Sequence, residues 1–233
     1  MNYDDYFALR GVAPDSGAPG PMPSWLRDVL PQDHDANILD LGCGFGRQLR
    51  QIRDADYPNV TGADVSRAAI EHCQGAGLRA KHIANIGEFA RGQTGKFAFV
   101  LMSHVLEHVP KDETIPALRD IRSMLAPGGA FCVMVPNAQS PIGCYWAYED
   151  FTHQTLFTAG SLLHVLRAAG FTSIRFLDTE GLSDMPPLRR WFKRSLLHLY
   201  RTNLLFWNRV TTNPYHAASP KIFTWELKAL ARL

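Results

Sequence analysis

The side chains best suited to chemistry in this sequence lie in one short run, His104-Val105-Leu106-Glu107-His108, which follows the apolar segment 97–103. If this run forms a helical turn, His104, Glu107 and His108 share one face, because residues three and four apart are neighbours on a helix. Imidazole and carboxylate groups can accept a proton or bind a divalent cation. His153 is a fourth candidate, since its loop follows the next predicted strand. We therefore expect catalysis or metal binding where the segment 97–103 ends.

A second run, at residues 37–47, has the composition of a ligand-binding loop. It reads N-I-L-D-L-G-C-G-F-G-R, in which Asp40 is followed by glycines at 42, 44 and 46. Glycine lets the backbone approach a ligand closely. A buried strand, a glycine turn and the start of a helix form a cradle for a nucleotide-like ligand at the carboxyl end of a sheet. The spacing differs from the G-x-G-x-x-G of dinucleotide oxidoreductases, and the alternative is a tight turn that binds nothing.

The D-L-G-C-G-F-G-R of residues 40–47 resembles the first motif of class I S-adenosylmethionine-dependent methyltransferases, and the L-A-P-G-G of residues 125–129 resembles a turn of the same family. The resemblance implies S-adenosyl-L-methionine (SAM) as the cofactor, with the glycine loop around its methionine part and Asp40 near its amino group. The cofactor-binding residues expected on this basis are Asp40, Gly42, Cys43, Gly44, Gly46, Arg47, Asp64, Val65, Asn85, Ile86, Ser103 and His104.

Two of these positions carry a more specific expectation. Asp64 ends the second predicted strand, 18 residues beyond the last glycine of the loop, where an acid can accept hydrogen bonds from ribose hydroxyls. The alternative is that Asp64 is a helix N-cap, a role that Ser66 could also fill. The resemblance places the adenine contact at Asn85 and Ile86, although the family often has an acid there and Asn85 departs from that pattern.

The run H-x-x-E-H with a later histidine is similar to the E-x-x-E-H of two metal-dependent branches of the family, the small-RNA 2′-O-methyltransferases and the ubiquinone-pathway O-methyltransferases. The resemblance implies a divalent metal held by His104, Glu107, His108 and His153. His104 stands where the pattern has its first Glu. Imidazole shifts the preference of such a site from Mg²⁺ toward Zn²⁺, Mn²⁺ or Fe²⁺.

Three interpretations of this group stay open. In the first, a metal binds the acceptor hydroxyl and lowers its pKa. In the second, His108 or His153 acts as a general base without metal, because histidine titrates near neutrality. In the third, His104 is structural and Glu107 caps or pairs locally. The catalytic candidates are His108, His153 and Glu107.

The elements that must position these residues follow from short apolar runs. Such runs, separated by helical patterns, are typical of an α/β fold with a doubly wound parallel sheet. The resemblance implies a seven-stranded Rossmann-like sheet in the order 3-2-1-4-5-7-6, with strand 7 antiparallel. The expected strands are 38–41, 60–65, 78–83, 97–103, 130–135, 171–177 and 222–231.

The sequence indicates one domain with two additions. Residues 1–36 form a Pro- and Gly-rich leader, with a linker at 12–24, and residues 37–233 form the methyltransferase domain. Within this domain, residues 183–220 form an insertion between strands 6 and 7 with six basic residues and one acid, a net charge of +5. Residues 188–210 have the pattern of an amphipathic helix that lies on a membrane or docks on a partner. The alternative is a helix packed on its own sheet.

Composition limits the partners and the cellular location that we expect for the protein. The chain has 233 residues, of which 46% are apolar, and a formal net charge of +2, which does not favour a nucleic-acid partner. Its four cysteines form no C-x-x-C, and its first ten residues are polar and acidic, unlike a secretory signal. No apolar run approaches the roughly 20 residues of a spanning helix. We expect a cytoplasmic protein that lies at the inner face of the membrane if residues 188–210 bind it.

These patterns together predict a SAM-dependent O-methyltransferase. The expected acceptor is a sugar hydroxyl in cell-surface polysaccharide or lipopolysaccharide synthesis, on a glycan or a lipid-linked glycan, because the H-x-x-x-F-T at residues 153–158 is similar to methyltransferases of those pathways. One alternative is O-methylation of a quinone or another small aromatic molecule. A second is a non-catalytic module that binds the cofactor and a partner.

Overall fold

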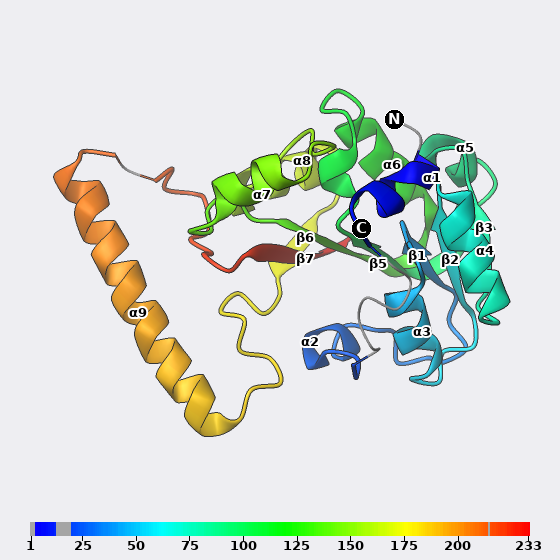
Figure 1. Ribbon diagram of the computed structural model, residues 1–233, viewed down its shortest axis with the longest axis horizontal. Coiled ribbons are helices and arrows are strands. Elements are labelled where there is room, and N and C mark those ends of the chain that lie inside the picture. The colour runs from blue at the N-terminus through cyan, green and yellow to red at the C-terminus, as the bar shows by residue number, and fades with distance from the viewer. Residues whose placement is uncertain (1–2, 13–19, 214) are drawn as a thin grey trace.

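The computed structural model describes residues 3–12, 20–213 and 215–233, and residues 13–19 of the expected linker lie outside this part of the chain. Its centre is a seven-stranded sheet in the order β3-β2-β1-β4-β5-β7-β6 (Figure 1). Neighbouring strands are parallel except β7, which is antiparallel to β5 and β6. The α/β fold and strand order expected from the sequence are confirmed.

The element bounds are close to those expected. The strands are β1 (Ile38–Leu41), β2 (Val60–Asp64), β3 (Ala80–His82), β4 (Phe97–Ser103), β5 (Leu125–Pro136), β6 (Ser173–Phe176) and β7 (Glu226–Arg232). The helices are α1 (Tyr3–Leu9), α2 (Ser24–Arg27), α3 (Arg47–Arg53), α4 (Arg67–Gly75), α5 (Ile86–Ala90), α6 (Thr114–Met124), α7 (Gly143–Glu149), α8 (Ala159–Ala168) and α9 (Pro187–Val210), with a 3-10 turn η1 (Leu106–His108).

Helices cover both faces of the sheet, and each face has its own apolar cluster. On one face, Leu26 of α2, Leu49 of α3 and Ile70 of α4 pack under the strands. On the other face, Leu118 of α6 and Leu162 of α8 pack against the opposite sides of the same strands. Because both faces are covered, the central strands have almost no polar side chains, as continuous apolar runs predict. Because β1 pairs in parallel with β2 and β4, the carboxyl ends of these three strands lie at the same edge of the sheet.

β5 is longer than expected because the L-A-P-G-G run belongs to it. The sequence places a turn at residues 125–129, but Leu125 already pairs with Phe97 of β4. The reversal is tight: a Cβ added at Gly129 would lie 2.8 Å from the carbonyl oxygen of Ala126 and 3.0 Å from that of Phe97. Only glycine fits between these two backbone oxygens.

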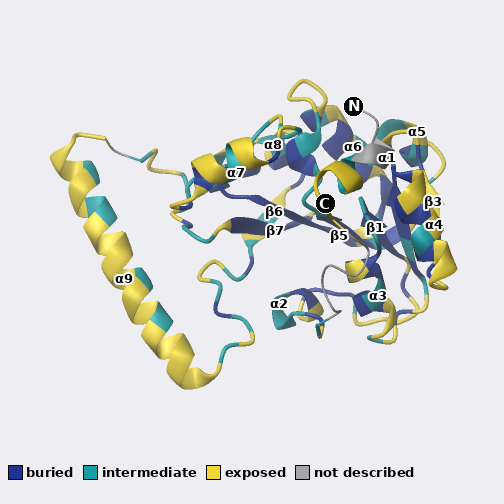
Figure 2. Cartoon of the chain, in the orientation of Figure 1, coloured by how far each residue is buried: buried dark blue, intermediate teal, exposed yellow. Residues whose placement is uncertain are grey.

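α9 stands apart from the sheet and its covering helices (Figures 1 and 2). None of its 24 residues, Pro187–Val210, is buried. The expected alternative of a helix packed on its own sheet is therefore not what the structure shows. Among the helices of the described ranges, none combines the length and the apolar character needed to cross a bilayer.

The Gly129 contact generates a prediction about stability. We expect Gly129→Ala to lower the free energy of unfolding by about 1–3 kcal/mol, because the added methyl group must displace backbone rather than a side chain. Gly75→Ala at the end of α4 is the matched control, since a Cβ there meets nothing within 4 Å. Chemical denaturation of both variants measures the difference. Equal stability of the two variants would contradict the tight turn.

Candidate active site

The glycine loop joins β1 to α3 and lies against the run that carries the histidines. Gly42 has a left-handed φ of 78°, and a Cβ there would collide with the side chain of Val105. A glycine at this position therefore lets residues 104–108 approach the loop. The expected cofactor loop and the expected catalytic residues are thus packed against each other, and Gly44, Gly46 and Arg47 continue the loop into α3.

Two buried carboxylates line the loop. Asp40 is 1% exposed, and its Oδ2 has no hydrogen-bond partner among the residues that the structure describes. Burial, together with the nearby charge of Asp64, raises the pKa of Asp40 to about 7. Asp64 accepts hydrogen bonds from the backbone N–H groups of Gly44 (2.8 Å) and Ser66 (2.9 Å). A buried acid beside a glycine loop, with one carboxylate oxygen left without a partner among the described residues, fits a ligand that carries an amino group and a sulfonium, as SAM does.

The other expected cofactor residues lie around this loop. Ser66 is the N-cap of α4, where its hydroxyl accepts from the backbone of Ala69 at 3.2 Å, so Asp64 is not the cap. Asn85 is the N-cap of α5, which begins at Ile86. The amide of Gln48 donates to the hydroxyl of Ser103 at 3.3 Å. The ribose contact of Asp64 and the adenine contact of Asn85 and Ile86 stay predictions, as do the contacts expected of Cys43 and Val65.

His104 differs most from its expected role. It has a left-handed φ of 54°, so it precedes η1 and does not share its face. Its Nδ1 lies 3.4 Å from Glu107 Oε1, its Nε2 lies 3.2 Å from Glu226 Oε2, and its ring stacks on Trp225. Burial alone would lower the pKa of His104, but the two carboxylates raise it to about 9. His104 also lies outside the group of potential metal ligands found among the described residues, which consists of Glu107, His108 and His153.

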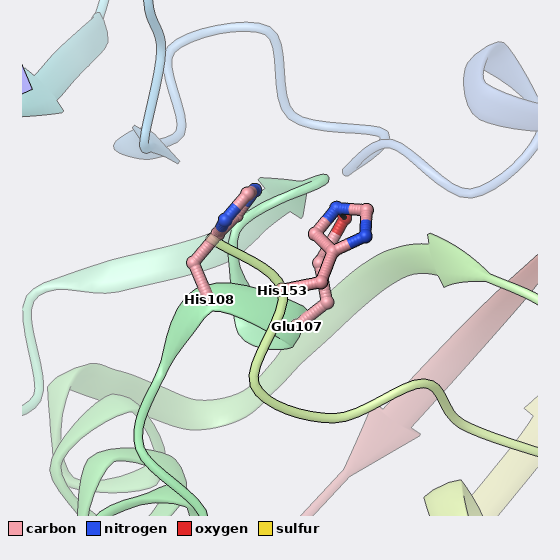
Figure 3. A group of neighbouring side chains, drawn as sticks. All are labelled: Glu107, His108 and His153. Atoms are coloured by element: carbon pink, nitrogen blue, oxygen red, sulfur yellow. Dashed lines mark ion pairs between the residues drawn. The ribbon is translucent and has the colours of Figure 1, made fainter. Parts of the chain in front are cut away.

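Glu107, His108 and His153 form the compact group that the sequence anticipates (Figure 3). Their potential ligand atoms all lie within 4.8 Å of one another. Glu107 is fully buried, and neither carboxylate oxygen has a hydrogen-bond partner within the described part of the chain. A buried carboxylate without hydrogen bonds is costly, so the group is suited to take up a cation or a hydroxyl donor.

A hydrogen-bond relay fixes the tautomer of His108. The hydroxyl of Thr152 donates its one proton to Asp150 Oδ1 at 2.6 Å, so the 2.7 Å contact between this hydroxyl and His108 Nδ1 requires a proton on Nδ1. Neutral His108 then has its lone pair on Nε2. Burial lowers the pKa of His108 below its usual value, which favours this neutral form at neutral pH. His108 is therefore prepared to accept a proton or to bind a metal.

His153 is fixed in a similar way. Its Nδ1 lies 2.7 Å from the carbonyl oxygen of Trp146, which can only accept, so Nδ1 is the donor. Its Nε2 lies 4.0 Å from Glu107 Oε1 and 3.9 Å from Asp150 Oδ2. The loop after α7 thus brings His153 to the turn after β4, as the neighbouring positions of β4 and β5 predict.

The sequence did not identify the residues that complete the site from distant segments. The Tyr6 hydroxyl donates to Asp150 Oδ2 at 2.5 Å, and Arg10 lies 3.5 Å from the same oxygen. Although burial opposes it, hydrogen bonds from Thr152 and Tyr6 lower the pKa of Asp150 to about 2. Glu226 is the first residue of β7, and Trp225 directly precedes it. The one local signal was the D-x-T spacing of residues 150–152, which is typical of an Asx turn.

The sheet order and the glycine loop define a SAM-dependent methyltransferase fold. The structure is similar to that of a SAM-dependent methyltransferase from Archaeoglobus fulgidus, with a TM-score of 0.64 and 17% identity over 98% of this chain and 97% of the other. A family profile described as a methyltransferase domain matches residues 16–175 of the chain. The chain therefore belongs to this methyltransferase family.

Two curated relatives are more specific in name. The chain is 25% identical over 173 residues to the O-methyltransferase resE of Aspergillus sclerotiorum, a match that covers 70% of this chain and 64% of that protein. It is 26% identical over 110 residues to a ubiquinone biosynthesis O-methyltransferase of Bordetella avium, which covers 45% of this chain and 44% of that protein. The chain thus matches less than two thirds of the length of either relative.

The buried carboxylate of Asp40, whose Oδ2 has no partner among the described residues, leads to a prediction about cofactor binding. We expect Asp40→Asn to weaken SAM binding about tenfold to hundredfold, because a hydrogen bond to a charged group contributes about 1.5–3 kcal/mol. Isothermal titration calorimetry measures the affinity. Asp54→Asn, an exposed acid after α3, is the control and should bind normally.

The same variant should not destabilise the protein at neutral pH. The pKa of Asp40 rises from 3.8 to about 7 on folding, so the folded state holds this proton more tightly than the unfolded chain. Stability from this group is greatest below pH 3.8 and falls as the pH rises through 7. A large loss of thermal stability in Asp40→Asn would therefore contradict this account.

Proposed function

We propose that this protein is a SAM-dependent O-methyltransferase that acts on a weakly acidic hydroxyl. The observation that carries the proposal is the fully buried Glu107, which lies beside the oriented His108 and against the glycine loop. Its carboxylate oxygens have no hydrogen-bond partner among the described residues, and the nearest cationic group is the His104 ring at 3.4 Å. An alcohol must lose its proton as it is methylated, and this group offers a proton acceptor next to the expected cofactor loop.

The residues divide the work as follows. SAM, when bound, supplies a methyl group already activated by its sulfonium. Asp40 and Asp64 hold the cationic and hydroxyl parts of the cofactor, respectively. His108 Nε2 accepts the proton of the acceptor hydroxyl, while Thr152 and Asp150 keep the ring in the correct tautomer and stabilise its protonated form. Alignment of the hydroxyl with the methyl group supplies most of the remaining rate enhancement.

The proposed acceptor is a sugar hydroxyl of a cell-surface glycan or lipid-linked glycan. Sugar hydroxyls are weaker acids than phenols and need a base more. The segment beside His153 also exposes aromatic side chains: Tyr145 is 53% exposed, Tyr148 85% and Phe151 94%. Exposed aromatic rings next to a site suit stacking on a sugar face.

A second candidate is supported by the named relatives. One relative is a ubiquinone biosynthesis O-methyltransferase, and for such an aromatic acceptor a divalent metal on Glu107, His108 and His153 would lower the pKa of a phenol. The structure offers three convergent ligands for such an ion, and a site of two imidazoles and one carboxylate suits Zn²⁺, Mn²⁺ or Fe²⁺. His104 is not in this set.

Loss of the base provides the central test. We expect His108→Gln to lower kcat by about 10²- to 10⁴-fold with little change in SAM affinity, because glutamine keeps a hydrogen bond to Thr152 but accepts no proton. A panel of glycans and hydroxylated aromatic acceptors, with methyl transfer followed by mass spectrometry, supplies the activity. His164→Gln, at an exposed position of α8, is the matched control and should be fully active.

Two outcomes would overturn or redirect the proposal. Full activity of His108→Gln would remove the proposed base, and cofactor binding without transfer to any acceptor would favour a non-catalytic module. Treatment with a chelator distinguishes a site that uses a bound metal from one in which His108 acts as a base without metal. Lost activity that is restored by Zn²⁺ or Mn²⁺ would favour the metal, whereas unchanged activity would favour the free base.

The lowered pKa of His108 predicts the pH dependence of the metal-free form. The neutral ring is the active form, and burial lowers its pKa below the usual 6.5. Activity should therefore stay constant as the pH falls through 6.5 and decrease only at lower pH, when the ring gains a proton. Measurement of kcat/KM between pH 5 and 8 checks this. A decrease that begins above pH 6.5 would contradict the assignment of His108.

A further inference from the structure

The helix α9 is a feature that methyl transfer does not require. It contains six Lys and Arg residues and no acid within Pro187–Val210. At 24 residues it is about 36 Å long. Figure 2 shows it exposed along its length and separate from the body of the protein.

The apolar side of α9 faces away from the rest of the chain. Leu188, Phe192, Leu199, Phe206 and Val210 recur at spacings of four and seven, so they line one side of the helix. Leu188 is 79% exposed, Phe192 58% and Phe206 57%.

The residues of α9 that are partly covered lie on another side. They are Lys193, Leu197, Leu204, Leu205 and Asn208. Lys193 Nζ donates to the carbonyl oxygen of Gly181 at 2.6 Å, and the ring of Tyr200 contacts Phe223. These contacts attach the helix to the chain without covering its apolar face.

The charges of α9 complete an amphipathic pattern. Arg190, Arg194 and Arg201 lie opposite the apolar face, and Arg189 and Arg209 flank it. Trp191 and Trp207 stand near the two ends of the helix. Tryptophan and arginine are the residues that prefer the boundary between lipid headgroups and acyl chains.

We propose that α9 lies flat on an anionic membrane surface, with its apolar face among the acyl chains and its basic residues at the headgroups. Lipid provides both an apolar layer and a negative surface, which match the two sides of this helix. A second copy of the chain matches less well, because the Arg189 and Arg209 that flank the apolar face of one helix would meet like charges of the other, and α9 contains no acid to pair with them. Since no described helix can span a bilayer, the contact is peripheral.

The position of α9 connects the membrane to the active site. The chain returns from α9 to β7 through residues 211–225, and this segment ends at Trp225, which stacks on His104. A lipid-bound α9 would therefore keep the end of the site that contains Trp225 and His104 close to the membrane. This second step rests on the proposed function, whereas membrane binding itself does not.

Co-sedimentation with vesicles tests the proposal on the full chain. The wild-type protein should pellet with vesicles of phosphatidylcholine and phosphatidylglycerol at low salt, and much less at high salt or with phosphatidylcholine alone. We expect Phe192→Ser/Phe206→Ser and Arg190→Glu/Arg201→Glu each to weaken binding at least about tenfold. Arg91→Glu/Lys96→Glu is the control, because it makes the same change in net charge at exposed residues elsewhere.

Each outcome is informative because the variants should fold. None of the α9 residues is buried, so thermal unfolding of both α9 variants should match that of the wild-type protein. Failure of the wild-type protein to pellet with anionic vesicles would overturn the proposal, as would equal loss in the control. A dimer seen by light scattering without lipid and abolished by Phe192→Ser/Phe206→Ser would assign the face to a second copy instead. Methyl transfer to a water-soluble acceptor should be unaffected by the α9 variants.

Discussion

The structure depends on keeping several acidic side chains buried at the carboxyl edge of its sheet. Asp40, Asp64, Glu107 and Glu226 are each at most 8% exposed. Burial of a charge is costly unless partners replace water, and these acids are satisfied to different degrees. Backbone N–H groups satisfy Asp64, and His104 and Lys228 hold the pKa of Glu226 down despite its burial. Among the described residues, Asp40 Oδ2 and both carboxylate oxygens of Glu107 have no hydrogen-bond partner, and these two acids are among the residues expected at the site.

Two cationic side chains, Lys228 and His104, offset the cost of burying the acids at this edge of the sheet. Lys228 Nζ lies 2.8 Å from Glu226 Oε1 and 3.3 Å from Asp178 Oδ2, while His104 lies between Glu226 and Glu107. This chain of alternating charges joins the start of β7 to the end of β4. Its effect on function is to make His104 a fixed positive group. His108 and His153 are then the two imidazoles whose Nδ1 atoms are held by hydrogen bonds and whose Nε2 atoms are left for a proton or a metal.

The same edge is also where distant parts of the chain come together. α1 contributes Tyr6 and Arg10 to Asp150, and the ring of Phe7 contacts Phe45 in the glycine loop at 4.7 Å. The segment that returns from α9 contributes Trp225. The expected cofactor loop, the proposed proton acceptor and the segment that follows α9 therefore meet at one edge of the sheet, where doubly wound folds place their ligands.

The sequence by itself determined the backbone framework and the local chemistry. Apolar runs specified the strands, glycines 42, 44 and 46 specified the loop, and the spacing within 188–210 specified an amphipathic helix, because each signal depends only on near neighbours. Tertiary structure alone decided that His104 is paired with Glu226, 122 residues away, and that Tyr6 completes the relay through Asp150, 144 residues away. Tertiary structure also decided that the apolar face of α9 does not pack on the sheet. Such pairings depend on topology and on the balance of buried charge, which no local spacing encodes.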